Sequence, residues 1–154
     1  MSGSVPHTHL CFVSQQAAAN LLPLLDRDFA PKRVLLAVTP QMSEAARSLE
    51  EAIKLLPYPI ECERVPLDDA YDVEKLEDLL LTLVEKLDKG TAVNLTGGTK
   101  LMSLVAQRAA QLAELDSFYL QHDTGEVLYF GANVRGVRKI PLRFAKPLLP
   151  YLRA

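Results

Sequence analysis

The chain has 154 residues, of which 49% are hydrophobic, and its formal net charge is −2. This composition predicts one globular domain with a core of its own and excludes an intrinsically disordered chain. The near-neutral charge gives no overall basic field for duplex nucleic acid, so a nucleotide ligand needs a local site.

The ends of the chain and its two cysteines suggest where the domain begins and in which cellular compartment it folds. Residues 1–4, MSGS, resemble a cloning remnant, and we assign residues 5–154 to a single domain. No apolar run reaches the ~18 residues of a membrane span, although a removed upstream segment would leave room for a tether. Cys11 and Cys62 lie in apolar stretches, which predicts buried, reduced thiols and a cytoplasmic domain.

The first half of the chain alternates strand-like and helix-like segments. Segments rich in β-formers predict strands at 9–14, 33–40 and 60–67, of which the last alternates as an exposed strand does. Helices are predicted between them at 15–26 and 41–56. We expect Ser14 to cap the first helix, and Pro23 to kink it or end it early.

The second half begins with the clearest helix. Its apolar residues recur at three- and four-residue steps, at Val73, Leu76, Leu79, Leu80, Leu83, Val84 and Leu87. Gly90 suits the C-terminal stop of this helix. A fourth strand is predicted at 91–96 and a fourth helix from about Thr99 to Glu114. Residues 117–132 then predict two strands around a turn at Asp123–Gly125, whereas the tail resists assignment.

These alternations predict the α/β class: a Rossmann-like, mainly parallel sheet flanked by helices, with a C-terminal β-hairpin. Right-handed crossovers give a strand order near 3-2-1-4-5, with a sixth strand antiparallel at the edge. Ligands bind such sheets at the carboxyl ends of neighbouring strands where the order switches, here strands 1 and 4. The loops there, Ser14–Gln16 and Thr96–Lys100, form one candidate site.

The string NLTGGTK (94–100) dominates this site. It lacks the Gly-Lys-Ser/Thr of a Walker A loop, and the turn after strand 1 has no glycine for a dinucleotide pyrophosphate. Gly97 and Gly98 allow a sharp turn and a close approach to a ligand. The amides of Gly98, Thr99 and Lys100 are predicted at a helix N-terminus, which favours an anion, and Lys100 adds a positive charge.

The polar side chains of the string admit two interpretations. The hydroxyls of Thr96 and Thr99 can donate to phosphate or ribose oxygens. Asn94 points into the strand environment, where it either binds base edges or braces the loop. Without a ligand, the same string is a Gly-Gly turn in which Thr99 caps the helix and Lys100 is solvated.

Two strings together resemble the CARF family (CRISPR-associated Rossmann fold). They are LTGGTKLMSLVA after the fourth strand and FVSQQAAANLLPLLD after the first, and the similarity runs over about residues 9–132. It is greatest to CARF domains fused to nucleases in type III CRISPR defence, a branch to which NLTGGTK is fairly specific. The resemblance implies a homodimeric receptor that holds a cyclic oligoadenylate, most often cyclic tetra-adenylate, between two symmetry-related sites.

The resemblance also implies which loops contact the ligand. They contribute Ser14 and Gln15 after strand 1, Thr39, Pro40, Gln41 and Met42 after strand 2 as adenine-pocket residues, and Asn94, Thr96, Gly97, Gly98, Thr99 and Lys100 around strand 4. No cofactor is implied, and the pair His7 and His9 lacks the further ligands of a metal site. Neither a PD-(D/E)xK nuclease pattern nor a HEPN Arg-x4-His motif is apparent in this chain.

Three functions stay open. The first is a cyclic tetra-adenylate receptor that activates an effector in antiviral defence, within a full-length protein that is free or membrane-tethered. The second is a standalone, metal-independent ring nuclease, in which Ser14 and Lys100 align the ribose 2′-hydroxyl for attack and stabilise the developing charge. The third is a nucleotide-binding module outside CRISPR. We favour the first, because no general base accompanies Ser14 and Lys100.

Overall fold

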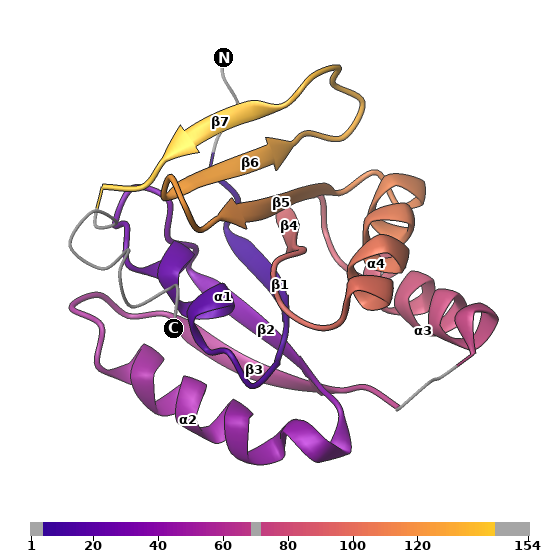
Figure 1. The fold of residues 1–154 in the computed structure, drawn as a ribbon, viewed down its shortest axis with the longest axis horizontal. Helices are drawn as coiled ribbons and strands as arrows, with labels where there is room; N and C mark the ends of the chain where they lie inside the picture. Colours follow the sequence, from indigo (N-terminus) through magenta and orange to yellow (C-terminus); the bar gives the residue numbers. More distant parts are fainter. Residues whose placement is uncertain (1–4, 69–71, 144–154) are drawn as a thin grey trace.

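The computed structural model describes residues 5–68 and 72–143, and in this part of the chain seven strands form one sheet (Figure 1). They are β1 (Thr8–Phe12), β2 (Arg33–Val38), β3 (Glu61–Pro66), β4 (Thr91–Asn94), β5 (Asp116–Gln121), β6 (Glu126–Phe130) and β7 (Arg138–Pro141). The order is β3-β2-β1-β4-β5-β6-β7. The first five strands run parallel, and β6 and β7 are antiparallel. The predicted class, strand order and C-terminal hairpin are confirmed.

Helices cover both faces of this sheet (Figure 1). On one face α3 (Val73–Glu85) packs beside α4 (Lys100–Leu112), and on the other lie α1 (Ala18–Leu21) and α2 (Ser43–Lys54). Short 3-10 turns follow α1 at Leu22–Leu24 and precede α2 at Pro40–Met42. Because successive side chains of a strand point to opposite faces, each central strand contributes side chains to the hydrophobic cores on both faces of the sheet.

Strand β1 shows this alternation clearly. Leu10 and Phe12 pack into the core under α3 and α4, whereas Cys11 packs into the core under α2. A third cluster of apolar side chains, which includes Phe29 and Phe118, lies beside β5 and β6. The central strands are therefore rigidly held on both faces, and their carboxyl ends give the following loops fixed starting points.

The first predicted helix needs a correction. Helix α1 has only four residues and passes into the 3-10 turn that contains Pro23, so the early end expected at this proline is confirmed. The expected Ser14 cap is wrong. Ala17 occupies the N-cap position without a side-chain bond, and the Ser14 hydroxyl donates to the Gln16 carbonyl at 3.4 Å.

Three further local expectations change. Helix α3 ends at Glu85, and Gly90 lies in the turn before β4, where its amide donates to Asp88 at 2.8 Å. The tail that resisted assignment contains β7, which pairs with β6. Cys62 is half-buried on the exposed edge strand β3, so only Cys11 is the buried thiol that we expected. Residues 1–4 and the tail after Arg143 lie outside the described residues.

Candidate functional site

The loops after β1, β2 and β4 meet around one pocket of about 380 Å³, which we call the switch-point pocket. Its lining consists of Val13, Ser14, Ala37, Thr39, Gln41, Met42, Leu67, Gly98, Thr99 and Met102. Parallel strands end at the same edge of a sheet, so the meeting of these loops follows from the strand order. Six of the twelve residues expected in the site line this pocket.

The two glycines of the β4–α4 loop serve different purposes. Gly97 is buried, and a Cβ atom there would lie 2.4 Å from the carbonyl oxygen of Phe12. Gly98 is exposed and has φ of +82°, in the left-handed region that favours glycine. The absence of a side chain at Gly97 thus allows the loop to lie close against β1, and the positive φ of Gly98 turns the backbone into the start of α4.

The start of α4 presents unused hydrogen-bond donors. Thr99 is the N-cap, because its Oγ1 accepts from the amide of Met102 at 3.1 Å. Among the described residues, no acceptor binds the amides of Gly98, Thr99 or Lys100. Lys100 is exposed, and no described carboxylate pairs with it. The Gly-Gly turn with Thr99 as helix cap is therefore present. It leaves three free amides and the charge of Lys100 at a helix N-terminus, an arrangement that suits an anion.

Asn94 braces this loop from below. Its side chain is fully buried, and its Nδ2 donates to the Ala19 carbonyl at 3.1 Å while its Oδ1 accepts from the Thr96 amide at 2.9 Å. Asn20, buried beside it, donates to the Phe12 carbonyl at 2.9 Å. These bonds tie β1, α1 and β4 together. Of the two interpretations of Asn94 the geometry supports the brace, and its contact with a ligand stays a prediction.

The remaining expected residues lie at the margins of the pocket. Thr96 and Lys100 line a second cavity on the other side of the β4–α4 loop. The Thr96 hydroxyl accepts from the Leu120 amide at 2.8 Å, and its proton is left to donate. Gln15 and Pro40 are exposed and line neither cavity. Their contact with a ligand stays a prediction.

Sequence reasoning missed the apolar wall of the switch-point pocket. Leu67, directly after β3, and Met102, in the first turn of α4, contribute to the lining but carry no polar group that a motif search would notice. No sequence signal marked them. The structure places Met102 against the turn, since a Cβ atom at Gly98 would lie 3.0 Å from the Met102 Sδ. Both side chains suit the apolar face of a nucleobase.

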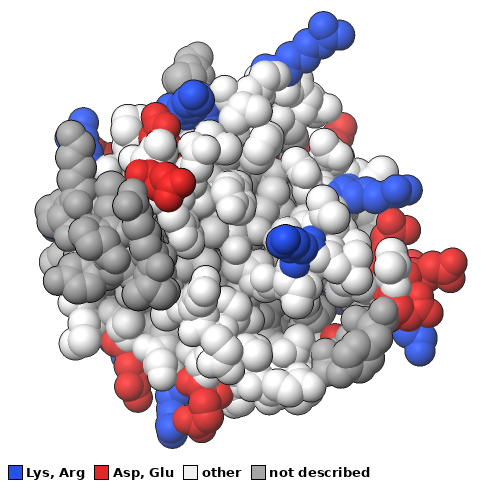
Figure 2. Space-filling view, in the orientation of Figure 1, with Lys and Arg blue, Asp and Glu red and all other residues white. Residues whose placement is uncertain are grey.

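Charge and reactive groups limit the chemistry. On the face shown in Figure 2, charged side chains of both signs lie mainly around the rim and form no broad basic patch. Burial raises the pKa of the Cys11 thiol to about 12, so it is no nucleophile. Within the described residues, no cluster of three potential metal ligands occurs, and no helix combines the length and apolarity of a membrane span.

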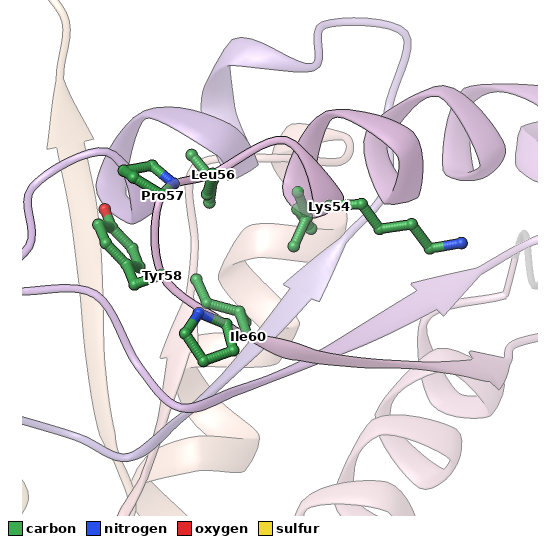
Figure 3. A pocket seen from close by; sticks show the side chains of 7 residues that line it. Lys54, Leu56, Pro57, Tyr58 and Ile60 are labelled. Carbon is green, nitrogen blue, oxygen red and sulfur yellow. The ribbon is translucent and has the colours of Figure 1, made fainter.

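Another cavity, of about 440 Å³, lies at the α2–β3 connection (Figure 3). Its lining consists of Ile53, Lys54, Leu56, Pro57, Tyr58, Pro59 and Ile60, and Figure 3 shows the Lys54 side chain directed away from the other labelled groups. The Tyr58 hydroxyl donates to the Leu24 carbonyl, and the Arg27 guanidinium stacks over its ring at 5.0 Å. Because the Tyr58 hydroxyl is already bonded and the Lys54 side chain is directed away from the other labelled groups, this cavity is a weaker candidate than the switch-point pocket.

Comparison with known proteins identifies the family. A family model described as the Card1 CARF domain matches residues 8–135. The chain belongs to this CARF family. The match includes the loops after β1, β2 and β4, so the predicted resemblance is confirmed, while the link of NLTGGTK to a nuclease-fused branch stays a prediction.

Solved structures share the fold of this CARF domain. Can2 from Sulfobacillus thermosulfidooxidans, in complex with cyclic tetra-adenylate (cA4), has a TM-score of 0.73 and 23% identity, covering 90% of this chain and 36% of that one. Protein VC1899 from Vibrio cholerae has a TM-score of 0.69 and 11% identity, covering 86% and 35%. This chain thus spans little more than a third of the length of either. None of the curated proteins matches it.

Proposed function

We propose that this CARF domain is a receptor for cyclic oligoadenylate, most favourably cyclic tetra-adenylate, and that it activates an effector in type III CRISPR defence. One observation carries the proposal. The unused amides of Gly98, Thr99 and Lys100 lie at the start of α4, beside a pocket at the switch point of a CARF fold. The similar fold of Can2, which is in complex with cyclic tetra-adenylate, supports the choice of ligand.

Each part of the ligand has a matching surface. A phosphate at the start of α4 accepts from the free amides and is stabilised by the helix dipole and by Lys100. The Thr99 hydroxyl has a proton left to donate, since its oxygen is used only as an acceptor. An adenine base fits the switch-point pocket, where Leu67, Met42 and Met102 provide apolar walls.

The proposed receptor is a homodimer. One chain offers a single β4–α4 loop, which suits about half of a ring that carries four phosphates. Such a ring contains a twofold axis, and a C2 dimer can place its own axis on it, so that two identical loops serve equivalent halves. Each subunit then meets two phosphates.

Sensing fits the lining better than cleavage does. Among the described residues, the switch-point pocket is lined by no His, Asp or Glu that could act as a general base. The Ser14 hydroxyl already donates to a backbone carbonyl. We therefore propose that the ring stays intact on the protein, and a ring nuclease is the alternative that loses support.

A binding screen tests the proposal. Calorimetry should show strong binding of cyclic tetra-adenylate, weaker binding of other ring sizes and little binding of linear tetra-adenylate or AMP. Equal affinity for AMP would favour a nucleotide-binding module outside CRISPR. Chromatography after hours of incubation should recover the ring, whereas repeated turnover to linear products with a 2′,3′-cyclic phosphate would show a ring nuclease.

A further inference from the structure

The cavity of about 440 Å³ at the α2–β3 connection, which we call the α2–β3 cavity, shares no lining residue with the switch-point pocket (Figure 3). Six of its seven lining residues are apolar or aromatic, and the seventh is Lys54. Between two of the lining residues, Leu55 leaves 85% of its surface exposed. An open apolar cavity next to an exposed leucine suits an apolar occupant.

The described chain leaves the fold next to this cavity. Arg143 is the last described residue, and its amide donates to Oδ2 of the buried Asp26 at 3.0 Å. Leu24, two residues before Asp26, accepts from the Tyr58 hydroxyl, and the Arg27 guanidinium stacks over the Tyr58 ring at 5.0 Å. The single turn 24–27 therefore joins Arg143 to the aromatic wall of the cavity, so the chain after Arg143 starts close to it.

The sequence beyond Arg143 contains an apolar segment. Residues 147–152 read PLLPYL, with Lys146 before them and Arg153 after them. The spacing P-x-x-P favours an extended polyproline II conformation, which docks on aromatic-lined grooves with little loss of conformational entropy. An extended chain advances about 3.3–3.6 Å per residue, so residues 144–146 can bridge roughly 10 Å between Arg143 and this segment.

We propose that residues 147–152 bind the α2–β3 cavity of their own chain, with their apolar side chains against Leu56, Tyr58 and Ile60. The cavity is then an intramolecular peptide-binding site that fastens the chain after β7 to α2 and to the turn 24–27. An undocked segment would expose three leucines to water, whereas docking buries them together with Leu55. The inference does not depend on the proposed function, because the two sites share no residue.

The composition of the cavity favours a peptide over a small polar ligand. Its only polar side chains are those of Lys54 and Tyr58. The Tyr58 hydroxyl is bonded to Leu24, and Lys54 is directed away from the other labelled groups (Figure 3). No lining side chain is therefore left to orient a small ligand, whereas an apolar peptide segment needs only the apolar and aromatic surface.

Fluorescence of a variant in this segment tests the inference. The chain has no tryptophan, so Tyr151→Trp places a single indole in residues 147–152. Its emission should lie at a shorter wavelength in the folded protein than in urea, and acrylamide should quench it several-fold less. Both properties should persist on dilution. Equal quenching in the folded and the unfolded chain would overturn the inference. Protection that disappears on dilution would place the segment of a second copy in the cavity and would overturn it as well.

A charge placed in the cavity shows where the segment binds. Pro59→Asp changes an exposed lining residue, and in the Tyr151→Trp chain it should raise quenching toward the value in urea, because a carboxylate is costly to bury against an apolar segment. Val134→Asp is the matched control, since Val134 is an exposed loop residue of the β6–β7 connection, across the molecule from the cavity (Figure 1). It should leave quenching unchanged. Protection that survives Pro59→Asp as fully as Val134→Asp would contradict binding in this cavity.

A double-mutant cycle gives an independent measurement, which decides if Pro59→Asp prevents folding. Leu149→Ala in the segment and Ile60→Ala in the cavity should each lower the urea concentration at the midpoint of unfolding. The double variant should lower it by less than the sum of the two shifts, because side chains in contact lose the same interaction in either variant. Shifts that simply add would show that the segment and the cavity do not touch, and would overturn the inference.

Discussion

Asn94 of β4 and His9 of β1 are buried polar side chains on the same face of the sheet, but only Asn94 has hydrogen-bond partners within the described part of the chain. Cys11 of β1 pairs with Asn94 of β4, and His9, two residues before Cys11, shares its face. Asn94 is fully hydrogen-bonded. Both ring nitrogens of His9 lack a partner among the described residues, and Phe29 and Phe118 contact its ring at centroid distances of 5.4 and 4.8 Å.

The presence or absence of hydrogen-bond partners separates a buried polar group that supports the candidate site from one that only lowers the stability of the fold. The amide of Asn94 holds the loop whose free amides are proposed to bind an anion, so its burial supports the candidate site. The imidazole of His9 lies near the amino end of β1, away from that loop, and its burial without partners costs stability. Burial alone therefore does not distinguish a polar residue that supports the candidate site. The distinction comes from its hydrogen bonds and from whether it lies near the carboxyl or the amino end of its strand.

The largest expected effect is at Asn94. Asn94→Leu keeps a side chain of similar size but leaves the Ala19 carbonyl and the Thr96 amide without their partner. We expect a loss of about 2–4 kcal/mol in the free energy of unfolding, since each buried orphan group costs about 1–3 kcal/mol. Urea unfolding measures it. A change within the ~0.5 kcal/mol of ordinary surface substitutions would show that the brace is unimportant.

The effect of acid on His9 comes next. Burial lowers the pKa of His9 from 6.5 to about 3, so below pH 6.5 the unfolded chain binds a proton that the folded chain does not. The free energy of unfolding should therefore fall as the pH falls from about 6.5 toward 3, by up to about 1.4 kcal/mol per pH unit. Urea unfolding at about pH 7, 6 and 5 measures the slope. His9→Leu should flatten it, and an equally steep slope in that variant would assign the effect to other groups.

Lys100 should change binding without changing the fold. Lys100→Ala removes an exposed charge beside the free amides, and we expect ring affinity to fall by about 1–3 kcal/mol, the scale of a charge-assisted hydrogen bond. Stability should stay within about 0.5 kcal/mol. Lys54→Ala, at an exposed lysine near the α2–β3 connection, is the control. Calorimetry that finds the same affinity for both variants would remove Lys100 from the site.

The smallest expected effect completes the comparison. At neutral pH, His9→Leu should raise the free energy of unfolding by about 1 kcal/mol, because an apolar side chain replaces two unpartnered nitrogens among aromatic rings. Its sign is opposite to that of Asn94→Leu. Ring affinity should not change. A destabilised His9→Leu would mean that the imidazole makes a favourable contact that the ring distances do not reveal.

Much of the fold was predictable because the signals are local. Alternating apolar strands and helices specify parallel pairing, and right-handed crossovers then restrict the order. The loop Thr96–Lys100 was recognisable from two glycines and a cap before an apolar helix. Strand β7 was not, because Pro141 ends it and it pairs at the edge, where pairing depends on a neighbour that local sequence does not show.

The residues that support the candidate site from other elements were equally difficult to predict from the sequence. Asn20 reads as one polar residue in a short helical segment, and only the tertiary structure shows that it donates to Phe12 beside Asn94. The second cavity combines residues of the motif and of α4 with Tyr119 of β5 and Phe130 of β6, which lie outside the motif in sequence. Such contacts between separate elements are set by packing rather than by local pattern.

The stoichiometry of ring binding tests the central claim most directly. Calorimetry of cyclic tetra-adenylate against the wild-type chain, combined with light scattering of the same samples, gives ligands per chain and chains per particle. We predict a homodimer that binds one ring per two chains, with affinity that weakens as salt is added because the ring carries four charges. A monomer that binds one ring per chain at full affinity would contradict the shared site.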